Sequence, residues 1–403
     1  MRYLIFIFIL ISSLMADDLQ ELKDVAAKNN PALKAKFNEY MSAMEKVPQV
    51  SSLPDPQIAF GYFLSSVETR VGPQQAKLSL SQKFPWFGKL QSLEDHYSDL
   101  AKVKYNEFEA LKRRIDHSLE TVYYNYYLNR FKTDVYKDIL TKYEYFYKVA
   151  NNKYENGKTA LSDLIELEVK IDGIKNEIRV LSLDTTKFQA EINKLLNRDT
   201  VINISAETEI SSLEIDEINR DSLLYDNSDI KIVEAKIKAA ESGIEAANIA
   251  GYPDIAVGLD FVFVGERQDM DVEDSGKDVL MPMLSVSIPI YRDKYDAAVR
   301  ENEFASKRFA AERQNLINLI NEETDTYYTD YLKAKANIDF YSSATKKTER
   351  ALELKIDEYA NDIAEIDRII DLQDRLLRYK INLEKERIIK NITVSYINNV
   401  LRK

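Results

Sequence analysis

The side chains that most often carry catalysis or hold metal ions are scarce in this chain. Its 403 residues include no cysteine and only two histidines, His96 and His117. Without cysteine, neither a thiol nucleophile nor a cysteine-based zinc site can form. The two histidines fall on one predicted helix, about 32 Å apart along its axis, so they cannot act on the same atom. We therefore expect no enzyme activity and no cofactor.

One pair of sulfur atoms needs separate consideration. Met281 and Met283 flank Pro282, and thioether sulfur is a soft ligand that suits copper or silver ions. Methionine more often fills gaps in a loop or at the start of a strand. We favour that role, and we expect no metal site.

Charge and the first residues indicate an exported protein. The net charge is −12, which argues against nucleic acid or anionic lipid as a partner. Met1 and Arg2 precede an apolar run and then Ala16, a pattern typical of a secretory signal peptide over residues 1–16. We expect no transmembrane helix, because no other stretch is apolar for long enough. These features together favour a protein of the bacterial cell envelope.

The chain repeats its own sequence pattern in its second half. The segment Asn30–Lys34 recurs at Asn227–Lys231, and Ile58–Gly61 recurs at the same offset as Ile255–Gly258. The next match, Leu78–Ser81 with Leu284–Ser287, has a larger offset, so the second copy carries extra residues in between. Such self-similarity predicts two structural modules of the same kind that pack together. We place the first repeat at 17–198, a linker at 199–213 and the second repeat at 214–403.

Each repeat contains two strand-like segments in which large apolar residues alternate with small or polar ones. The predicted strands cover 57–65, 76–84, 254–263 and 282–290. This period of two indicates a sheet with one apolar face. A half-buried soluble sheet would show a similar alternation. The length, near the ~9–11 residues of a tilted membrane strand, and the small polar face favour strands that cross a membrane.

The remaining sequence predicts long helices. The stretches from Lys89 to near Ala150 and from Arg292 to near Leu354 lack glycine and proline, so each can form a helix of about 60 residues. Turns are expected at Gly157 and at Asn361-Asp362, where each helix folds back on a second one. An apolar heptad pattern follows the first turn, typical of coiled-coil packing; it comprises Leu164, Leu167, Ile171, Ile174, Ile178 and Leu181. The fold class is therefore α+β and mostly α, a duplicated helix-strand-strand-helical hairpin unit.

Four strands cannot close a barrel, and an open sheet edge cannot lie in lipid, so copies of the chain must combine. Two copies give eight strands with a filled interior, and three give twelve strands around a lumen. Both strand hairpins start and end on the helical side of the membrane. The acidic loop Val264–Leu280, which carries the extra residues of the second repeat, is then expected outside the cell.

The junction Phe84-Pro85-Trp86-Phe87-Gly88-Lys89 after the second strand resembles that of the TolC family of outer-membrane efflux proteins. The segments Tyr252-Pro253-Asp254 and Pro289–Tyr295 and the two hairpin turns are similar to that family too, in the same order. The resemblance implies a trimer, a twelve-stranded β-barrel in the outer membrane and a long α-helical barrel in the periplasm. The form of the junction with Trp86 and Gly88 is most similar to the heavy-metal efflux branch.

In function, the resemblance implies the exit duct of a tripartite efflux system, which passes small molecules or metal ions to the outside. The partners would be a periplasmic adaptor protein, an inner-membrane transporter and outer-membrane lipid, with no nucleic acid. An outer-membrane channel for type I protein secretion is the alternative within the family. A periplasmic coiled-coil scaffold is a rival outside it, and a passive porin is disfavoured because porins do not devote most of their chain to helices.

The resemblance also implies functional positions. Asp163 falls on the acidic position and Tyr359 on the aromatic position of the links that close the periplasmic gate, and Asp371 falls on a constriction carboxylate. Ala364 and Arg368 depart from the family pattern, since an arginine and an aspartate are expected there. The turns expected to contact the adaptor carry Tyr154, Gly157, Asn361 and Asp362, and the barrel–helix junction carries Phe84, Pro85, Trp86, Gly88 and Lys89.

Overall fold

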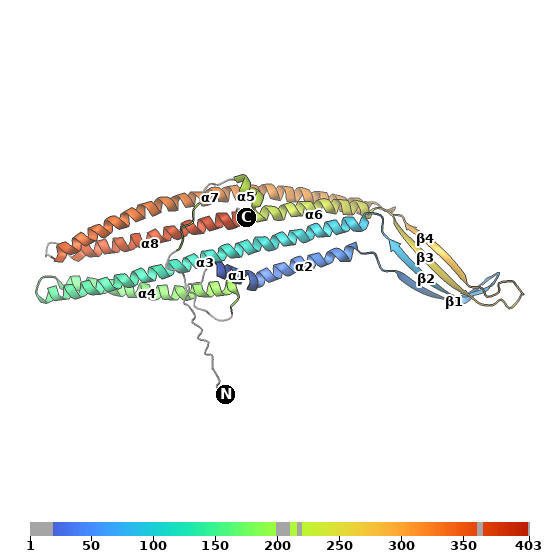
Figure 1. The fold of residues 1–403 in the computed structure, drawn as a ribbon, viewed down its shortest axis with the longest axis horizontal. Helices are drawn as coiled ribbons and strands as arrows, with labels where there is room; N and C mark the ends of the chain where they lie inside the picture. Colours follow the sequence, from blue (N-terminus) through green and yellow to red (C-terminus); the bar gives the residue numbers. More distant parts are fainter. Residues whose placement is uncertain (1–18, 199–209, 216–219, 361–365, 402–403) are drawn as a thin grey trace, which may run out of the picture. The chain divides into compact units, whose positions relative to one another are not determined.

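The fold is mostly helical, with one four-stranded antiparallel sheet (Figure 1). The structure is a computed structural model, and it describes residues 19–198, 210–215, 220–360 and 366–401. The proposed signal peptide and most of the proposed linker lie outside these residues. The order of elements in the first half recurs in the second; the elements are α1 (Leu19–Asn29), α2 (Pro31–Ser51), β1 (Gln57–Thr69), β2 (Gly72–Phe84), α3 (Lys89–Glu155), α4 (Leu161–Leu196), α5 (Arg220–Asp226), α6 (Ser228–Ala250), β3 (Asp254–Val264), β4 (Val279–Ser287), α7 (Asp293–Ala360), α8 (Ile366–Tyr396) and a short π-helix (Ile397–Leu401).

The chain divides into two compact units. Unit 1 comprises Met1–Ala35, Glu109–Ser228 and Ile317–Lys403, and unit 2 comprises Lys36–Phe108 and Asp229–Leu316. The long helices α3 and α7, of 67 and 68 residues, contribute to both units. Among the described helices, none combines the length and the apolar character needed to cross a bilayer.

The sheet belongs to unit 2, and its strands follow chain order, β1-β2-β3-β4. Strands β1 and β2 are longer than the sequence predicted, so only Arg70 and Val71 separate them. Strand β4 covers Val279–Ser287 rather than 282–290. It starts earlier because Val279 pairs with Val262, and it ends before Pro289, which has no N–H to donate to a ladder. Among the residues that the structure describes, no further strand lies beside the outer edges of β1 and β4.

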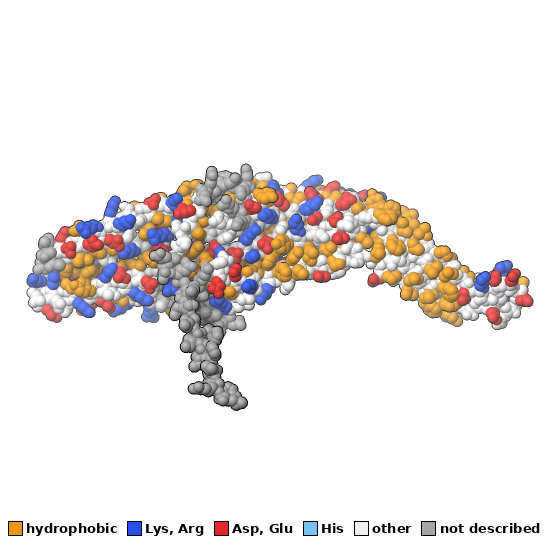
Figure 2. Space-filling model, viewed as in Figure 1, with side chains coloured by type: hydrophobic (Ala, Val, Ile, Leu, Met, Phe, Trp, Pro, Cys, Tyr) orange, Lys and Arg blue, Asp and Glu red, His pale blue; other side chains and the backbone are white. Residues whose placement is uncertain are grey.

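The register places the two kinds of residue on opposite faces, as the alternation predicted. Ile58, Leu80 and Leu259 face one another across three strands, whereas Ala59, Ser79 and Asp260 form the next row on the other face. The apolar face is exposed rather than buried; its exposed members include Ile58, Phe60, Tyr62, Leu64, Leu78, Leu80, Val257, Leu259, Leu284 and Val286. Figure 2 shows hydrophobic side chains gathered over the strands. A contiguous exposed apolar surface of this kind marks a membrane or protein contact.

The tips of the two strand hairpins bind each other through their backbones. Gly265 N–H donates to the Pro73 carbonyl at 2.8 Å, and Gly276 N–H donates to the Val71 carbonyl at 2.7 Å. Gly72 has a φ of +133°, and a Cβ there would lie 1.9 Å from the Gly265 carbonyl oxygen. Only glycine fits this close approach. The second tip is thus anchored on the first.

In unit 2, helices α2, α3, α6 and α7 lie side by side (Figure 1). Phe37 of α2 packs edge-on against Phe108 of α3, with ring centroids 5.6 Å apart. Asn106 of α3 donates to the Lys231 carbonyl of α6 at 3.0 Å. Arg313 of α7 forms an ion pair with Glu234 of α6 at 2.9 Å. Each helix of this layer is therefore joined to the next by specific contacts.

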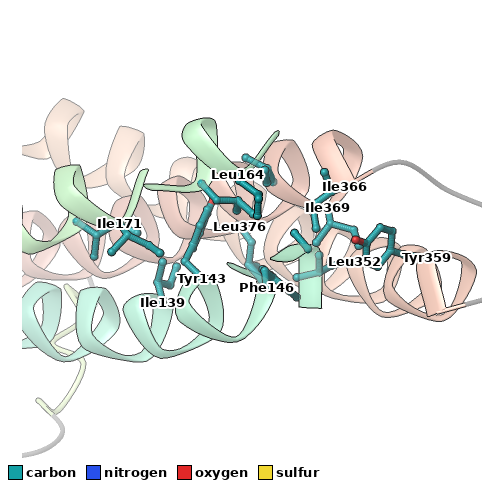
Figure 3. Packing of buried hydrophobic residues seen from close by; sticks show 14 residues of the cluster. Ile139, Tyr143, Phe146, Leu164, Ile171, Leu352, Tyr359, Ile366, Ile369 and Leu376 are labelled. Carbon is teal, nitrogen blue, oxygen red and sulfur yellow. The ribbon is translucent and has the colours of Figure 1, made fainter. Parts of the chain in front are cut away.

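Unit 1 contains a hydrophobic core formed by α3, α4, α7 and α8 (Figure 3). The heptad positions Leu164, Leu167 and Ile171 of α4 are buried in it, as the sequence predicted. The second hairpin contributes Ile369 and Leu376 from α8. The two helical hairpins thus share one core, because a single amphipathic helix cannot bury its apolar stripe alone.

A buried polar cluster joins α1, α3 and the C-terminal helices in unit 1. Ser395 Oγ and Asn399 donate to the Glu120 carboxylate, which also pairs with Lys23. The His117 Nδ1 lies 2.9 Å from Ser395 Oγ. Although serine, histidine and a carboxylate meet here, the carboxylate bonds the serine rather than orienting the histidine, and Ser395 is buried. The cluster therefore has a packing role.

This cluster predicts a pH dependence of stability. Burial is the main cause that lowers the pKa of His117, so the folded chain binds its proton less readily than the unfolded chain. The unfolded state takes up the extra proton first, and stability should fall as pH drops below about 6.5. Thermal melting between about pH 5 and 7 measures how steeply stability falls with pH. This dependence should be smaller in His117→Gln. An equal slope in the variant would contradict this role of His117.

Candidate functional site

The turn after α3 is fixed by its backbone. Gly157 has a φ of +70°, and its N–H donates to the Tyr154 carbonyl at 2.9 Å while Lys158 N–H donates to the Lys153 carbonyl at 2.8 Å. This pair of bonds is a Schellman motif, which ends a helix at a glycine. Tyr154 is exposed beside it. The turn therefore presents an aromatic side chain from a rigid helix end.

Helix α7 ends at Ala360 and helix α8 begins at Ile366. Asn361 and Asp362, which the sequence assigned to the second turn, and Ala364, which departs from the family pattern at the gate, lie outside the described residues. Their assignment stays a prediction.

Asp163 lies in the first turn of α4. Its carboxylate accepts hydrogen bonds from Thr159 Oγ1 at 2.6 Å and from Ser162 Oγ at 3.0 Å. The bond from Thr159 is the main cause that lowers the pKa of Asp163. A carboxylate is also favoured at a helix N-terminus by the helix dipole. Asp163 is therefore ionised, and these contacts stabilise the start of α4 within the first hairpin.

Tyr359 contacts Lys153, which belongs to the first hairpin. It is buried in the last turn of α7, and the Lys153 ammonium lies 3.7 Å from its ring centroid. The same ammonium donates to the Tyr359 carbonyl at 3.2 Å. Lys153 thus joins the ends of α3 and α7 by a cation–π contact and by a charge-assisted bond to a helix C-terminus. The sequence did not identify Lys153 as part of the link.

Arg368 and Asp371 are both exposed on α8, three residues apart, and so on one side of the helix. Arg375 donates to Asp371 at 2.9 Å. The carboxylate that the resemblance places at a constriction is therefore paired with a cation within its own helix. Two arginines, Arg368 and Arg375, lie about two turns apart on this helix and offset the acidity expected there.

A stronger link between the two hairpins was missed by sequence reasoning. Asp374 of α8 accepts a hydrogen bond from the Tyr143 hydroxyl of α3 at 2.7 Å and one from the Lys170 ammonium of α4 at 2.5 Å. The Tyr143 side chain is fully buried in the shared core (Figure 3), and burial is the main cause that raises its pKa. Asp374 follows Asp371 by one turn, which was the only signal, since its partners lie far away in sequence. We call Tyr143, Lys170 and Asp374 the inter-hairpin triad.

The strand–helix junction in unit 2 is organised around Asp254, the first residue of β3. Its carboxylate pairs with Lys89 at 2.7 Å and with Lys83 at 2.8 Å. The Trp86 ring stacks on Tyr252, with centroids 6.1 Å apart and an angle of 14°. One carboxylate therefore ties the end of β2, the start of α3 and the start of β3 together.

The other predicted junction residues have distinct roles. Gly88 has a φ of +81° and accepts the first helical hydrogen bond of α3, from Ser92 N–H at 2.8 Å. Phe84, Pro85 and Phe87 lie beside it, and Phe84 and Phe87 expose their rings. Exposed aromatic rings next to an apolar face are typical of a membrane–water boundary.

Metal ligands are not gathered in any described part of the chain. Within those ranges, no group of three or more histidine, aspartate or glutamate side chains is placed to hold an ion. Met281 and Met283 lie on the polar face of the sheet, paired with Asp260 and Gly258. The site residues described above form ion pairs, hydrogen bonds and ring contacts that join helices and strands.

The fold is that of bacterial outer-membrane channels. No protein-family model and no curated sequence matches the chain. Among solved structures, CusC, whose crystal structures concern transmembrane channel formation, matches with a TM-score of 0.78 at 14% identity over 96% of this chain and 92% of that one. The CmeC outer membrane channel of Campylobacter jejuni matches with a TM-score of 0.75 at 14% identity over 96% of this chain and 86% of that one. The outer membrane protein VceC of Vibrio cholerae matches with a TM-score of 0.75 at 16% identity over 95% of both chains.

At these identities the comparisons establish the fold. The resemblance to the TolC family, first seen in the residues of the junction and turns, is therefore confirmed at the level of the fold and over most of the chain.

Proposed function

We propose that the chain is one protomer of a trimeric exit duct in the bacterial outer membrane. The sheet carries the observation on which this depends. Its four strands end in two open edges and expose a contiguous apolar face, an arrangement that is stable in lipid only when copies close it into a barrel. Three copies give twelve strands and a lumen. The likeness to outer-membrane channels supports the same assembly.

The helices would then form a barrel in the periplasm, with residues 1–16 removed as a signal peptide and two repeats at 17–198 and 214–403. The partners in this proposal are a periplasmic adaptor and an inner-membrane transporter, and the cargo is a small molecule or a metal ion. A type I protein-secretion channel is the second candidate, because that assembly would use the same duct. A wholly periplasmic scaffold is disfavoured by the exposed apolar face of the sheet.

The gate is proposed to lie at the hairpin ends. Asp163, Tyr359, Arg368 and Asp371 remain its sequence-derived members, and Tyr154 and Gly157 the described residues that would contact the adaptor. The inter-hairpin triad extends this set, since it bonds α8 to both helices of the first hairpin. Opening would require these bonds to break or to rearrange.

Conductance tests the duct. The chain carries a net charge of −12, and a narrow lumen lined by one sign of charge concentrates its potential. We expect purified protein in planar bilayers to form cation-selective channels. Anion selectivity at moderate salt would contradict the proposed lumen, and no channels at all would contradict the duct. To identify the cargo, the gene is deleted and the sensitivity of the cells to metals, dyes and detergents is measured in parallel.

A further inference from the structure

Unit 2 contains a cavity of about 500 Å³ that none of the sites above uses. Helices α2, α3, α6 and α7 all contribute to its wall, so it lies on one face of the four-helix layer. Its volume falls in the range of small-molecule sites, which are concave and mostly apolar with a few polar groups.

The floor of the cavity is apolar. It is formed by Leu100 and Val103 of α3, Ala239 and Ala240 of α6, and Phe309 of α7. Small residues on α6 let the helices approach closely and leave room for a ligand over them. The floor therefore suits an alkyl chain or a flat apolar ring.

The rim of the cavity is cationic. It is formed by Lys46, Lys104, Lys236 and Arg308, with Glu107 as its acidic member. Glu107 pairs with Lys104 at 3.1 Å, and Arg308 lies 3.6 Å from Glu312 of its own helix. The lining itself still carries four cations and one carboxylate.

Two of these cations flank the aromatic floor. The Arg308 guanidinium lies 4.3 Å and the Lys236 ammonium 5.8 Å from the centroid of the Phe309 ring. The Arg308–Glu312 pair is exposed and therefore weak, so an anion at the ring edge can compete for the guanidinium. An anionic head and an apolar tail would thus meet adjacent and complementary groups.

The positive charge is local, because a different side of α3 and α6 is acidic. There Asp95 and Asp99 of α3 face Glu241 and Glu245 of α6, with Lys238 among them. The chain has a net charge of −12, so a cationic rim around an apolar floor differs from the charge of the chain as a whole. It is not explained by overall composition.

We propose that this cavity binds amphipathic organic anions, with one carboxylate or sulfonate between Lys236 and Arg308 and an apolar tail on Phe309. The inference goes beyond the proposed duct, because it depends only on contacts within unit 2. A ligand of this class would contact all four helices of the layer at once.

Isothermal titration calorimetry tests the site, with sodium octanoate as the probe. The full chain is kept in solution by an amphipathic polymer, so that no detergent competes for the cavity. Octanoate should bind, whereas octylammonium and acetate should not, since one has the wrong charge and the other has no tail. Hexanoate should bind more weakly, by about fourfold per methylene removed. The double variant Lys236→Gln, Arg308→Gln should weaken octanoate binding about tenfold or more. Phe309→Ala should weaken it as well.

Lys238→Gln is the matched control, because Lys238 is an exposed cation on the same helix but lies in the acidic groove. It should leave octanoate binding unchanged. Equal binding of octanoate and octylammonium, no binding to the parent chain, or an equal loss in Lys238→Gln would overturn the proposal. If a second copy of the chain covers the cavity, octanoate will not bind to the parent chain, and this result would overturn the proposal too. Calorimetry needs no conduction, so this failure would leave the proposed duct untouched.

Discussion

Replacing Asp374 by alanine is expected to lower the stability of the helical hairpins by about 1–3 kcal/mol. The variant leaves the buried Tyr143 hydroxyl and the Lys170 ammonium without the carboxylate that both bond. The loss costs more than the bond itself at Tyr143, because its buried hydroxyl stays desolvated, whereas the half-exposed Lys170 can turn to water. Thermal melting followed by helical circular dichroism measures the loss. In bilayers, the variant should also spend more time open if the triad holds the gate.

Asp371→Ala is the matched control, since it removes an exposed carboxylate one turn earlier on the same helix. The Asp371–Arg375 pair is exposed, and its loss should change stability by less than about 1 kcal/mol. Tyr143→Phe combined with Asp374→Ala should lose less than the sum of the single changes, because both remove one bond. Equal melting of the two aspartate variants, or strict additivity in the double variant, would show that the triad is not a link.

The second large effect is expected on the sheet. Leu80→Lys should lower the stability of the assembled barrel by about 2–4 kcal/mol, because it places a charge on the face proposed to contact lipid near mid-membrane. Leu80 lies in the central strand β2, with Ile58 and Leu259 beside it on the same apolar face. Resistance of trimers to heat in detergent measures the change.

Ser79→Lys tests the opposite face with a neighbouring residue of the same strand. Ser79 pairs with Ala59 and Asp260 on the polar face, where the Asp260 carboxylate already accommodates the ammonium of Lys77. Trimers of this variant should be as resistant as the parent. Tolerance of both lysines, or loss in both, would refute the membrane assignment of the two faces.

Much of the fold follows from local patterns. The alternation through Ile58, Phe60 and Tyr62 predicted the exposed face of the sheet, because residues two apart in a strand share a side. The heptad positions from Leu164 onwards predicted the buried stripe of α4 for the analogous helical reason. Strand ends were less predictable, since β4 is set by its pairing with β3 rather than by its own composition.

The candidate site was predictable only in its location. The turn at Gly157 has a local signature, whereas the partners across the hairpins do not. Lys153 contacts Tyr359, and Asp374 contacts Tyr143, only because separate helices share one core. Sequence reasoning assigned Asp254 no role beyond the segment Tyr252-Pro253-Asp254 that resembles the family, and its pairing with Lys83 and Lys89 depends on how β2 and β3 meet. Contacts between residues so far apart in sequence are set by tertiary packing, which periodicity does not encode.

The central claim is that three copies of this chain close their sheets into one barrel in the outer membrane. Native mass spectrometry of protein extracted from purified outer membranes tests it most directly. We predict one species of three chains, each beginning after the signal peptide, that separates into single chains only on heating. Recovery of single chains from the periplasmic fraction, with none in the outer membrane, would contradict the claim.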